Sequence, residues 1–189
     1  MSDKTYDTIE LQIEPADAIN VPWACKCDRC IILLNGRDIL DIIGDAELPF
    51  YKKEPDLSEE AAGCYHHMMP IELYEDLIEA EESNGEEIAH VLCCTCDETG
   101  CASARVRVLR TEDSIIWNDF RTMRGWDFGL SYEFEIDQYR EFLSQIKQMI
   151  PNWYIKKKKK EEFLDNLAKS KIGRFWLMKL IRILLGYHK

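Results

Sequence analysis

Cysteine residues carry the clearest potential for chemistry in this sequence, because they fall into two clusters. The chain has eight cysteines among 189 residues. The first cluster has the spacing C-x-C-x-x-C and comprises Cys25, Cys27 and Cys30. The second follows Cys93 directly, has the spacing C-x-C-x4-C and comprises Cys94, Cys96 and Cys101. Thiols grouped in this way bind a metal ion, carry out redox chemistry or pack as small apolar side chains.

The second cluster has a spacing that suits a zinc ion. Cys94 and Cys96 are two residues apart, so their side chains share one face of an extended strand. The sequence DETG then predicts a tight turn that returns Cys101 to the same point. Structural zinc takes four ligands, often thiolates at about 2.3 Å. We therefore predict a structural zinc site whose candidate ligands are Cys94, Cys96, Cys101, Cys27 and Cys30. Other candidates for the fourth ligand are Cys25, Cys64, His66, His67, His90 and Cys93.

Two other interpretations of the cysteines stay open. A thiol-dependent redox protein would use Cys25, Cys27 and Cys30, since both spacings within that cluster can form disulfides. No thioredoxin-like βαβ pattern surrounds them, however. Reduced cysteines are also among the most buried residue types, so both clusters are compatible with simple packing.

An aromatic-rich segment, WNDFRTMRGWDFGLSYEF at 117–134, is a second candidate site. Its possible ligand-binding residues are Trp117, Asp119, Arg121 and Trp126. Aromatic rings interleaved with arginines can stack on a ligand. The same pattern also fits an aromatic core beneath a sheet, with Asp119 and Arg121 paired at the end of a strand.

The residues typical of catalysis are not arranged in any recognisable motif. Cys64 lies near His66 and His67, but adjacent histidines on a loop point apart, and no acid is placed to orient either one. The sequence has no glycine-rich phosphate loop, no G-x-S-x-G and no H-E-x-x-H. It therefore favours a binding or scaffold module over an enzyme.

Hydrophobic periodicity predicts a mixed fold. Strand patterns occur at 8–13, 30–34, 88–94, 102–109, 114–120 and 130–136. Helical patterns occur at 37–47, 69–82 and 138–150, the last with Asp137 as its N-cap, and loops are expected at 48–63 and 63–70. Because βαβ regularity is absent, we predict an α+β fold with a mainly antiparallel sheet, a few flanking helices and a C-terminal helical extension.

Charge is distributed unevenly along the chain, which carries a net charge of −11. Residues 1–100 hold 24 acidic and 6 basic side chains, whereas 151–189 hold 3 acidic and 11 basic ones. This contrast predicts a domain at 1–150 followed by a basic amphipathic extension at 151–189. The extension could dock on its own domain, form a homodimer, bind a specific partner or lie on an anionic membrane surface.

The composition also argues against several classes of protein. The negative charge disfavours nucleic acid as the main partner. The N-terminal residues include no apolar signal segment, and no run of about 18 apolar residues could span a membrane. We therefore expect a cytoplasmic protein. Its basic extension could hold it at a membrane surface. In that compartment, eight cysteines are better interpreted as metal ligands or reduced thiols than as disulfides.

Three motifs follow one another between residues 91 and 143, namely VLCCTCDETGCASARVRV, IIWNDFR and WDFGLSYEFEIDQYREFL. In this order they resemble a family of uncharacterised bacterial proteins with an x-C-x-C-G-x-x-G-C loop, a W-x-x-F-R strand and an F-x-F-x-x-x-Q-Y ending. Upstream, ILLNGRDILDII is similar to the apolar-NGRDL opening of that family. The resemblance covers roughly residues 31–148.

The resemblance maps the family's motifs onto specific residues of this chain. The cysteine motif falls on Cys94, Cys96 and Cys101, and W-x-x-F-R falls on Trp117, Phe120 and Arg121. The chain departs from the family pattern at Asp97, where glycine is usual, in the added CKCDRC segment and in the basic tail. The family has no assigned activity, so the resemblance implies no reaction.

Overall fold

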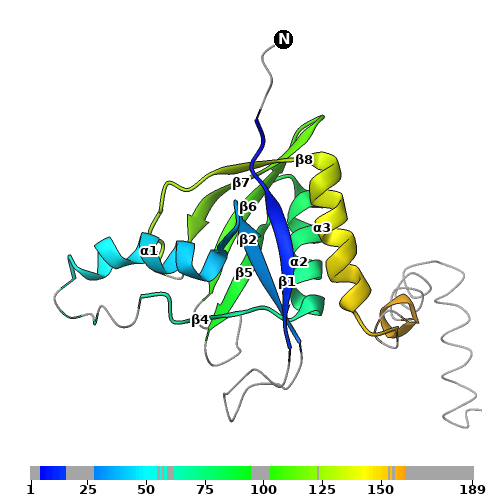
Figure 1. Cartoon of the computed structure of the whole chain (residues 1–189), viewed down its shortest axis with the longest axis horizontal. Helices are drawn as coiled ribbons and strands as arrows, with labels where there is room; N and C mark the ends of the chain where they lie inside the picture. Colours follow the sequence, from blue (N-terminus) through cyan, green and yellow to red (C-terminus); the bar gives the residue numbers. More distant parts are fainter. Residues whose placement is uncertain are drawn as a thin grey trace, which may run out of the picture. The chain divides into compact units, whose positions relative to one another are not determined.

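A computed structural model describes residues 5–15, 28–54, 56, 58, 62–94, 103–122, 124–152, 154 and 156–160 (Figure 1). The chain divides into two compact units, residues 1–149 and 150–189. Within the second unit, residues 156–160 are helical and exposed. The amphipathic part of the predicted extension lies outside the described residues. No helix in the described part of the chain is both long and apolar enough to cross a membrane.

Two antiparallel sheets form the framework of the first unit, which confirms the α+β class. The larger sheet has the order β4-β5-β6-β7-β8, formed by Tyr65–His67, Ile88–Cys94, Ala104–Arg110, Ser114–Arg121 and Tyr132–Glu135. The smaller has the order β1-β2-β3, formed by Ile9–Glu14, Arg29–Leu34 and Arg37–Asp38. Asn35 and Gly36, with φ of 51° and 75°, form the tight turn between β2 and β3.

The smaller sheet touches both edges of the larger one. Just before β1, Asp7 bridges Phe134 of β8, and the Asp7 N–H donates to the Glu133 carbonyl at 2.8 Å. At the other edge, Cys30 of β2 bridges Met68, which follows β4, and the Cys30 N–H donates to the Met68 carbonyl at 2.9 Å. The strands therefore follow one another round a ring that returns to β4.

The helices pack against this ring of strands. Helix α1 (Ile39–Tyr51) packs on β2, β3 and β4. Helices α2 (Pro70–Ser83) and α3 (Ile136–Met149) lie side by side (Figure 1). α2 packs on β5 and β6, and α3 packs mainly on β1, β7 and β8.

Several boundaries differ from those predicted. Helix α1 continues four residues beyond the predicted stretch and includes Pro49, which has no backbone N–H to donate within the last turn. Residues 65–67, predicted as loop, form β4, a strand too short to show alternation. Helix α3 begins at Ile136, so Asp137 lies in its first turn and is not the N-cap.

Helix α2 covers an edge of β5 that β4 leaves open. β4 pairs with β5 only from Leu92 to Cys94. Farther along β5, Asp76 of α2 accepts a hydrogen bond from the His90 backbone N–H at 3.0 Å, and the same carboxylate oxygen lies 2.6 Å from His90 Nδ1. The side chain of Asp76 therefore satisfies a donor at the strand edge.

A β-bulge at Asp119 explains the W-x-x-F spacing. Arg105 of β6 pairs with Arg121 of β7, and Arg107 pairs with Asn118, so β7 carries one extra residue between these pairs. Asp119 is that extra residue, and its backbone has a φ of 53°. As a result, Trp117 and Phe120 both face the core and are fully buried despite being three positions apart.

We expect Gly63→Ala to destabilise the protein more than Gly36→Ala. Both glycines have positive φ, which costs an alanine about 1 kcal/mol. A Cβ on Gly36 meets no atom within 4 Å, whereas one on Gly63 lies 3.0 Å from the Gly44 backbone of α1. Urea unfolding should therefore give a loss of about 1 kcal/mol for the first variant and about 2–3 kcal/mol for the second. Equal losses would show that the contact of α1 with Gly63 is not tight.

Candidate functional site

The structure describes half of the cysteines from the sequence. These are Cys30, Cys64, Cys93 and Cys94. The others, Cys25, Cys27, Cys96 and Cys101, lie outside the described residues. The zinc geometry predicted for Cys94, Cys96 and Cys101 therefore stays a prediction.

The residues that flank the two cysteine segments lie at the same end of the ring of strands. Strand β1 ends and β2 begins at the lower end in Figure 1, and β5 ends there as well. Strand β4 runs across this end, because Tyr65 pairs with Cys94 of β5 and Met68 pairs with Cys30 of β2. Pairing with β4 thus holds the start of β2 close to the end of β5.

A buried arginine joins the two flanks. Arg29, the first residue of β2, is 1% exposed. Its Nη1 donates to the His67 carbonyl at 2.9 Å and lies 3.9 Å from Cys93 Sγ. The Cys93 thiol in turn donates to the carbonyl of His66 at 3.5 Å. A side chain from within the first cysteine cluster therefore contacts the thiol that directly precedes the second. Sequence reasoning missed Arg29, whose polar side chain gives no sign of burial.

Cys30 occupies a core position. It is 1% exposed, and its Sγ lies 4.0 Å from Met149 Sδ of α3. Burial raises the pKa of the Cys30 thiol to about 12. These are the properties of a protonated thiol packed as a small apolar side chain. Among the described residues, no group of three or more His, Cys, Asp or Glu side chains is arranged to hold a metal ion.

Two of the histidines considered as a fourth ligand have carboxylate partners. His90 pairs with Asp76, as described for the edge of β5. His67 is largely buried, and its Nε2 lies 3.3 Å from Asp38 Oδ2. The other carboxylate oxygen of Asp38 accepts the Leu40 N–H at 2.8 Å and so caps α1. The His67 contact therefore joins β4 to the start of α1.

The predicted aromatic ligand site is divided between the core and the surface. Trp117 is fully buried against Phe134, Tyr139 and Phe142, and its Nε1 donates to the Tyr139 hydroxyl at 3.4 Å. Trp117 therefore belongs to an aromatic core beneath the sheet, as the alternative interpretation of this segment predicts.

The other three residues of that prediction lie outside the core. Asp119 accepts from Arg121 Nε at 2.5 Å, which confirms the predicted pair, and it also accepts from Arg107. Trp126 is half-buried and stacks on Phe50 of α1, with ring centroids 5.2 Å apart. This contact fixes the segment between β7 and β8 on the end of α1.

A buried carboxylate at the end of α1 was also missed. Glu47 is fully buried. Its two oxygens accept from the Tyr65 hydroxyl at 2.6 Å and from the Gly63 N–H at 2.9 Å. The sequence holds a signal for this burial, because Glu47 follows Ile39 and Ile43 at intervals of four residues on the inner face of the helix.

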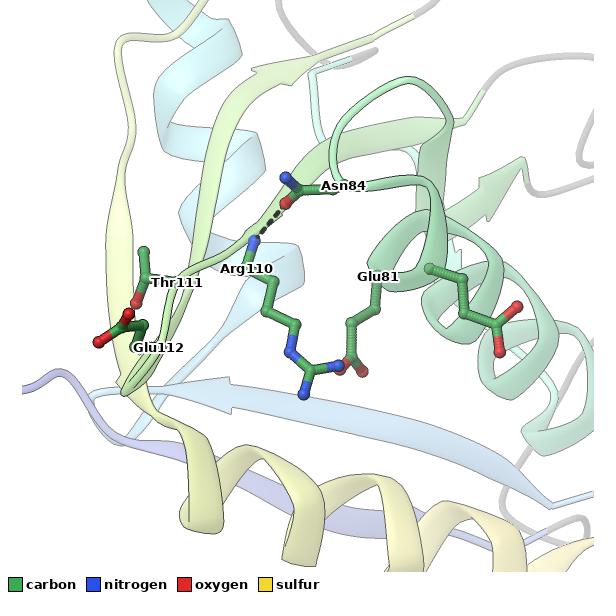
Figure 2. Close-up of a pocket in the computed structure, with 6 residues that line it drawn as sticks. Glu81, Asn84, Arg110, Thr111 and Glu112 are labelled. Carbon is green, nitrogen blue, oxygen red and sulfur yellow. Dashed lines mark hydrogen bonds and ion pairs between the residues drawn. The ribbon is translucent and has the colours of Figure 1, made fainter.

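A surface depression of about 650 Å³ lies where α2 ends beside the β6–β7 hairpin. Figure 2 shows residues that line it. Its cation, Arg110, lies 3.2 Å from Glu81 Oε1, and the Arg110 backbone N–H donates to Asn84 Oδ1 at 2.7 Å. These contacts fasten the end of α2 to the hairpin. The polar groups of the depression therefore have a structural explanation.

Comparisons of this chain with family models, with curated proteins and with solved structures give no match. The site must therefore be interpreted from its own geometry, and the resemblance to a bacterial family stays a prediction.

We expect alkaline pH to destabilise the protein through its buried tyrosines. Burial, followed by the hydrogen bond and charge of Glu47, raises the pKa of Tyr65, and burial raises the pKa of Tyr139. In the unfolded chain these phenols ionise near pH 10.0, while in the folded protein they stay protonated. Their contribution to stability is therefore complete below pH 10.0 and decreases above it.

Urea unfolding on both sides of this pH measures the effect. Tyr65→Phe should weaken the alkaline loss of stability, because its ring has no proton to release. Tyr74→Phe, which removes a partly exposed phenol of α2, is the matched control. If Tyr65→Phe and Tyr74→Phe both lose stability with rising pH as steeply as the unaltered protein, Tyr65 is not the source of the alkaline destabilisation.

Proposed function

We propose that this chain is a small, non-enzymatic binding or scaffold module for the reducing cytoplasm, in which a Cys-ligated zinc ion closes the lower end of the strand ring. The observation that carries the proposal is the contact between Arg29 and Cys93 at 3.9 Å. It brings together the flanks of two segments that each contain further cysteines. Ligands from both segments can then reach one ion.

Cys94, Cys96 and Cys101 are the proposed core ligands. Cys94 ends β5 and is partly exposed. Cys27 is the fourth ligand on this proposal. It is preferred to Cys30, whose thiol packs against Met149 in the core. Four thiolates are a donor set that zinc binds strongly in structural sites.

The benefit of such an ion would be to fix two long connections. Residues 15–28 join β1 to β2, and 95–103 join β5 to β6. Binding zinc to ligands from both would offset the entropy of ordering them, since the affinity for the metal becomes folding free energy. A rigid pair of connections is a suitable platform for binding a partner.

Metal analysis of protein purified without added metal tests this proposal. We expect about one zinc per chain, with thiols that resist alkylation until a chelator is added. Cys96→Ser and Cys101→Ser should each lose the metal, whereas Cys30→Ala should keep it. The thiols counted in the unfolded, reduced protein provide the reference value.

Absence of metal together with eight free thiols would contradict the proposal and leave buried or simply reduced cysteines. Absence of metal with fewer free thiols before reduction would favour the redox alternative, in which Cys25, Cys27 and Cys30 exchange disulfides. Retention of zinc in Cys96→Ser and Cys101→Ser, with loss in Cys30→Ala, would assign the site to the first cluster instead.

A further inference from the structure

Strand register places cationic side chains in one row on the outer face of the large sheet. Arg105 of β6 lies directly opposite His90 of β5 on one side and Arg121 of β7 on the other. Arg107 lies two residues along β6 on the same face. We call Arg105, Arg107, Arg121 and Asp119 the arginine face. The bulge at Asp119 creates it, because the extra residue brings Arg121 into register with Arg105.

The guanidinium groups of this face differ in how many hydrogen-bond partners they have. Arg107 donates to Asp119 Oδ2 at 3.2 Å and to the Gly85 carbonyl at 2.7 Å. Arg121 donates from its Nε to Asp119, and its side chain is 46% exposed. Arg105 is partly exposed, and its guanidinium has neither a hydrogen bond nor an ion pair to any residue that the structure describes.

Charge on the arginine face is not balanced by the residues that the structure describes. Among them, three guanidinium groups share one carboxylate, which leaves two positive charges uncompensated in a chain whose net charge is −11. On the β5 side, the Asp76 carboxylate contacts His90, with Oδ2 at 2.6 Å from Nδ1. Like charges directly opposite each other in a ladder are destabilising. A bound anion would remove this repulsion between Arg105 and Arg121.

We propose that Arg105 and Arg121 form a binding site for a phosphate monoester. Such a group carries a charge of about −1.5 to −2 at neutral pH, which matches the uncompensated charge better than a single carboxylate does. The planar fork of each guanidinium can donate two parallel hydrogen bonds to phosphate oxygens. Asp119 orients the Arg121 fork through its Nε and leaves the two terminal nitrogens of Arg121 without a partner among the described residues.

An exposed apolar side chain borders the site. Ile88 of β5 is 39% exposed and pairs with Arg107 on the same face. It provides a surface for the organic part of a phosphorylated ligand, next to the charged group. The site is formed entirely by β5, β6 and β7, and it uses none of the proposed zinc ligands. Its test is therefore independent of whether the protein holds a metal.

Titration of the full-length, isotope-labelled protein with inorganic phosphate, followed by NMR at constant ionic strength, tests the proposal. The backbone amides of Arg105 and Arg121 should shift saturably with phosphate and not with chloride. Arg105→Gln should weaken the apparent affinity by about tenfold or more, the expected cost of losing one charged, forked donor. Arg105→Lys, which keeps the charge without the fork, should give an intermediate loss.

Arg140→Gln is the matched control, because Arg140 lies on α3 and pairs with Asp137, away from the arginine face. It should change the phosphate affinity less than twofold. Equal shifts with chloride, or an unchanged affinity in Arg105→Gln with a folded spectrum, would overturn the proposal. If Arg105→Gln unfolds, the phosphate affinity of Arg105→Lys, measured on a variant whose spectrum is folded, provides the test instead.

A second arm asks where the phosphate comes from. If it belongs to a lipid headgroup, vesicles containing phosphatidic acid should bind the protein, and inorganic phosphate should displace it. That displacement should be absent in Arg105→Gln. If it belongs to a soluble monoester, phenyl phosphate should produce the same amide shifts, with no displaceable vesicle binding. Failure of both probes to act through Arg105 would also contradict the proposal.

Discussion

The exposed edges of the large sheet are the constraint on which the rest of this fold depends. Five paired strands leave two edges with unpaired backbone groups, and such edges invite association with other chains. The smaller sheet meets both, at Phe134 and at Met68. Helix α2 covers the part of β5 that β4 does not reach, and Asp76 satisfies the donor there. Once the ring is closed, the flanks of both cysteine segments share one end of the molecule.

Local sequence patterns were sufficient for most of the framework. The longer strands alternate clearly, the Asn-Gly pair marks its turn, and α2 begins at the proline that the sequence places there. β4 could not be found in the same way, because a strand of three residues depends on its partner and not on its own periodicity. The first unit of the fold was therefore predictable in class, while its closure was not.

The candidate sites were less predictable than the framework, because their residues depend on contacts and register that local sequence does not show. Cys30 alternates with Ile32 and Leu34, so its core position was present in the strand pattern, yet cysteine spacing suggested a ligand. Arg29 is buried through contacts with residues more than 30 positions away, which no local pattern records. The register of Arg105 with Arg121 depends on one extra residue at Asp119, and a sequence does not reveal which residue of a strand is bulged.

The bridge between Asp7 and β8 has a consequence for how the chain folds. The Asp7 carboxylate accepts the Glu133 N–H, and the two residues are 126 positions apart. Strand β1 can pair with β2 early in synthesis. Asp7, just before β1, must wait for almost the whole first unit to leave the ribosome before its partner on β8 exists. A topology closed by its most distant segments has a high contact order and folds slowly. Until then the outer edge of β8 has no partner from the smaller sheet, and an unpaired strand edge leaves the folding chain open to association with other chains.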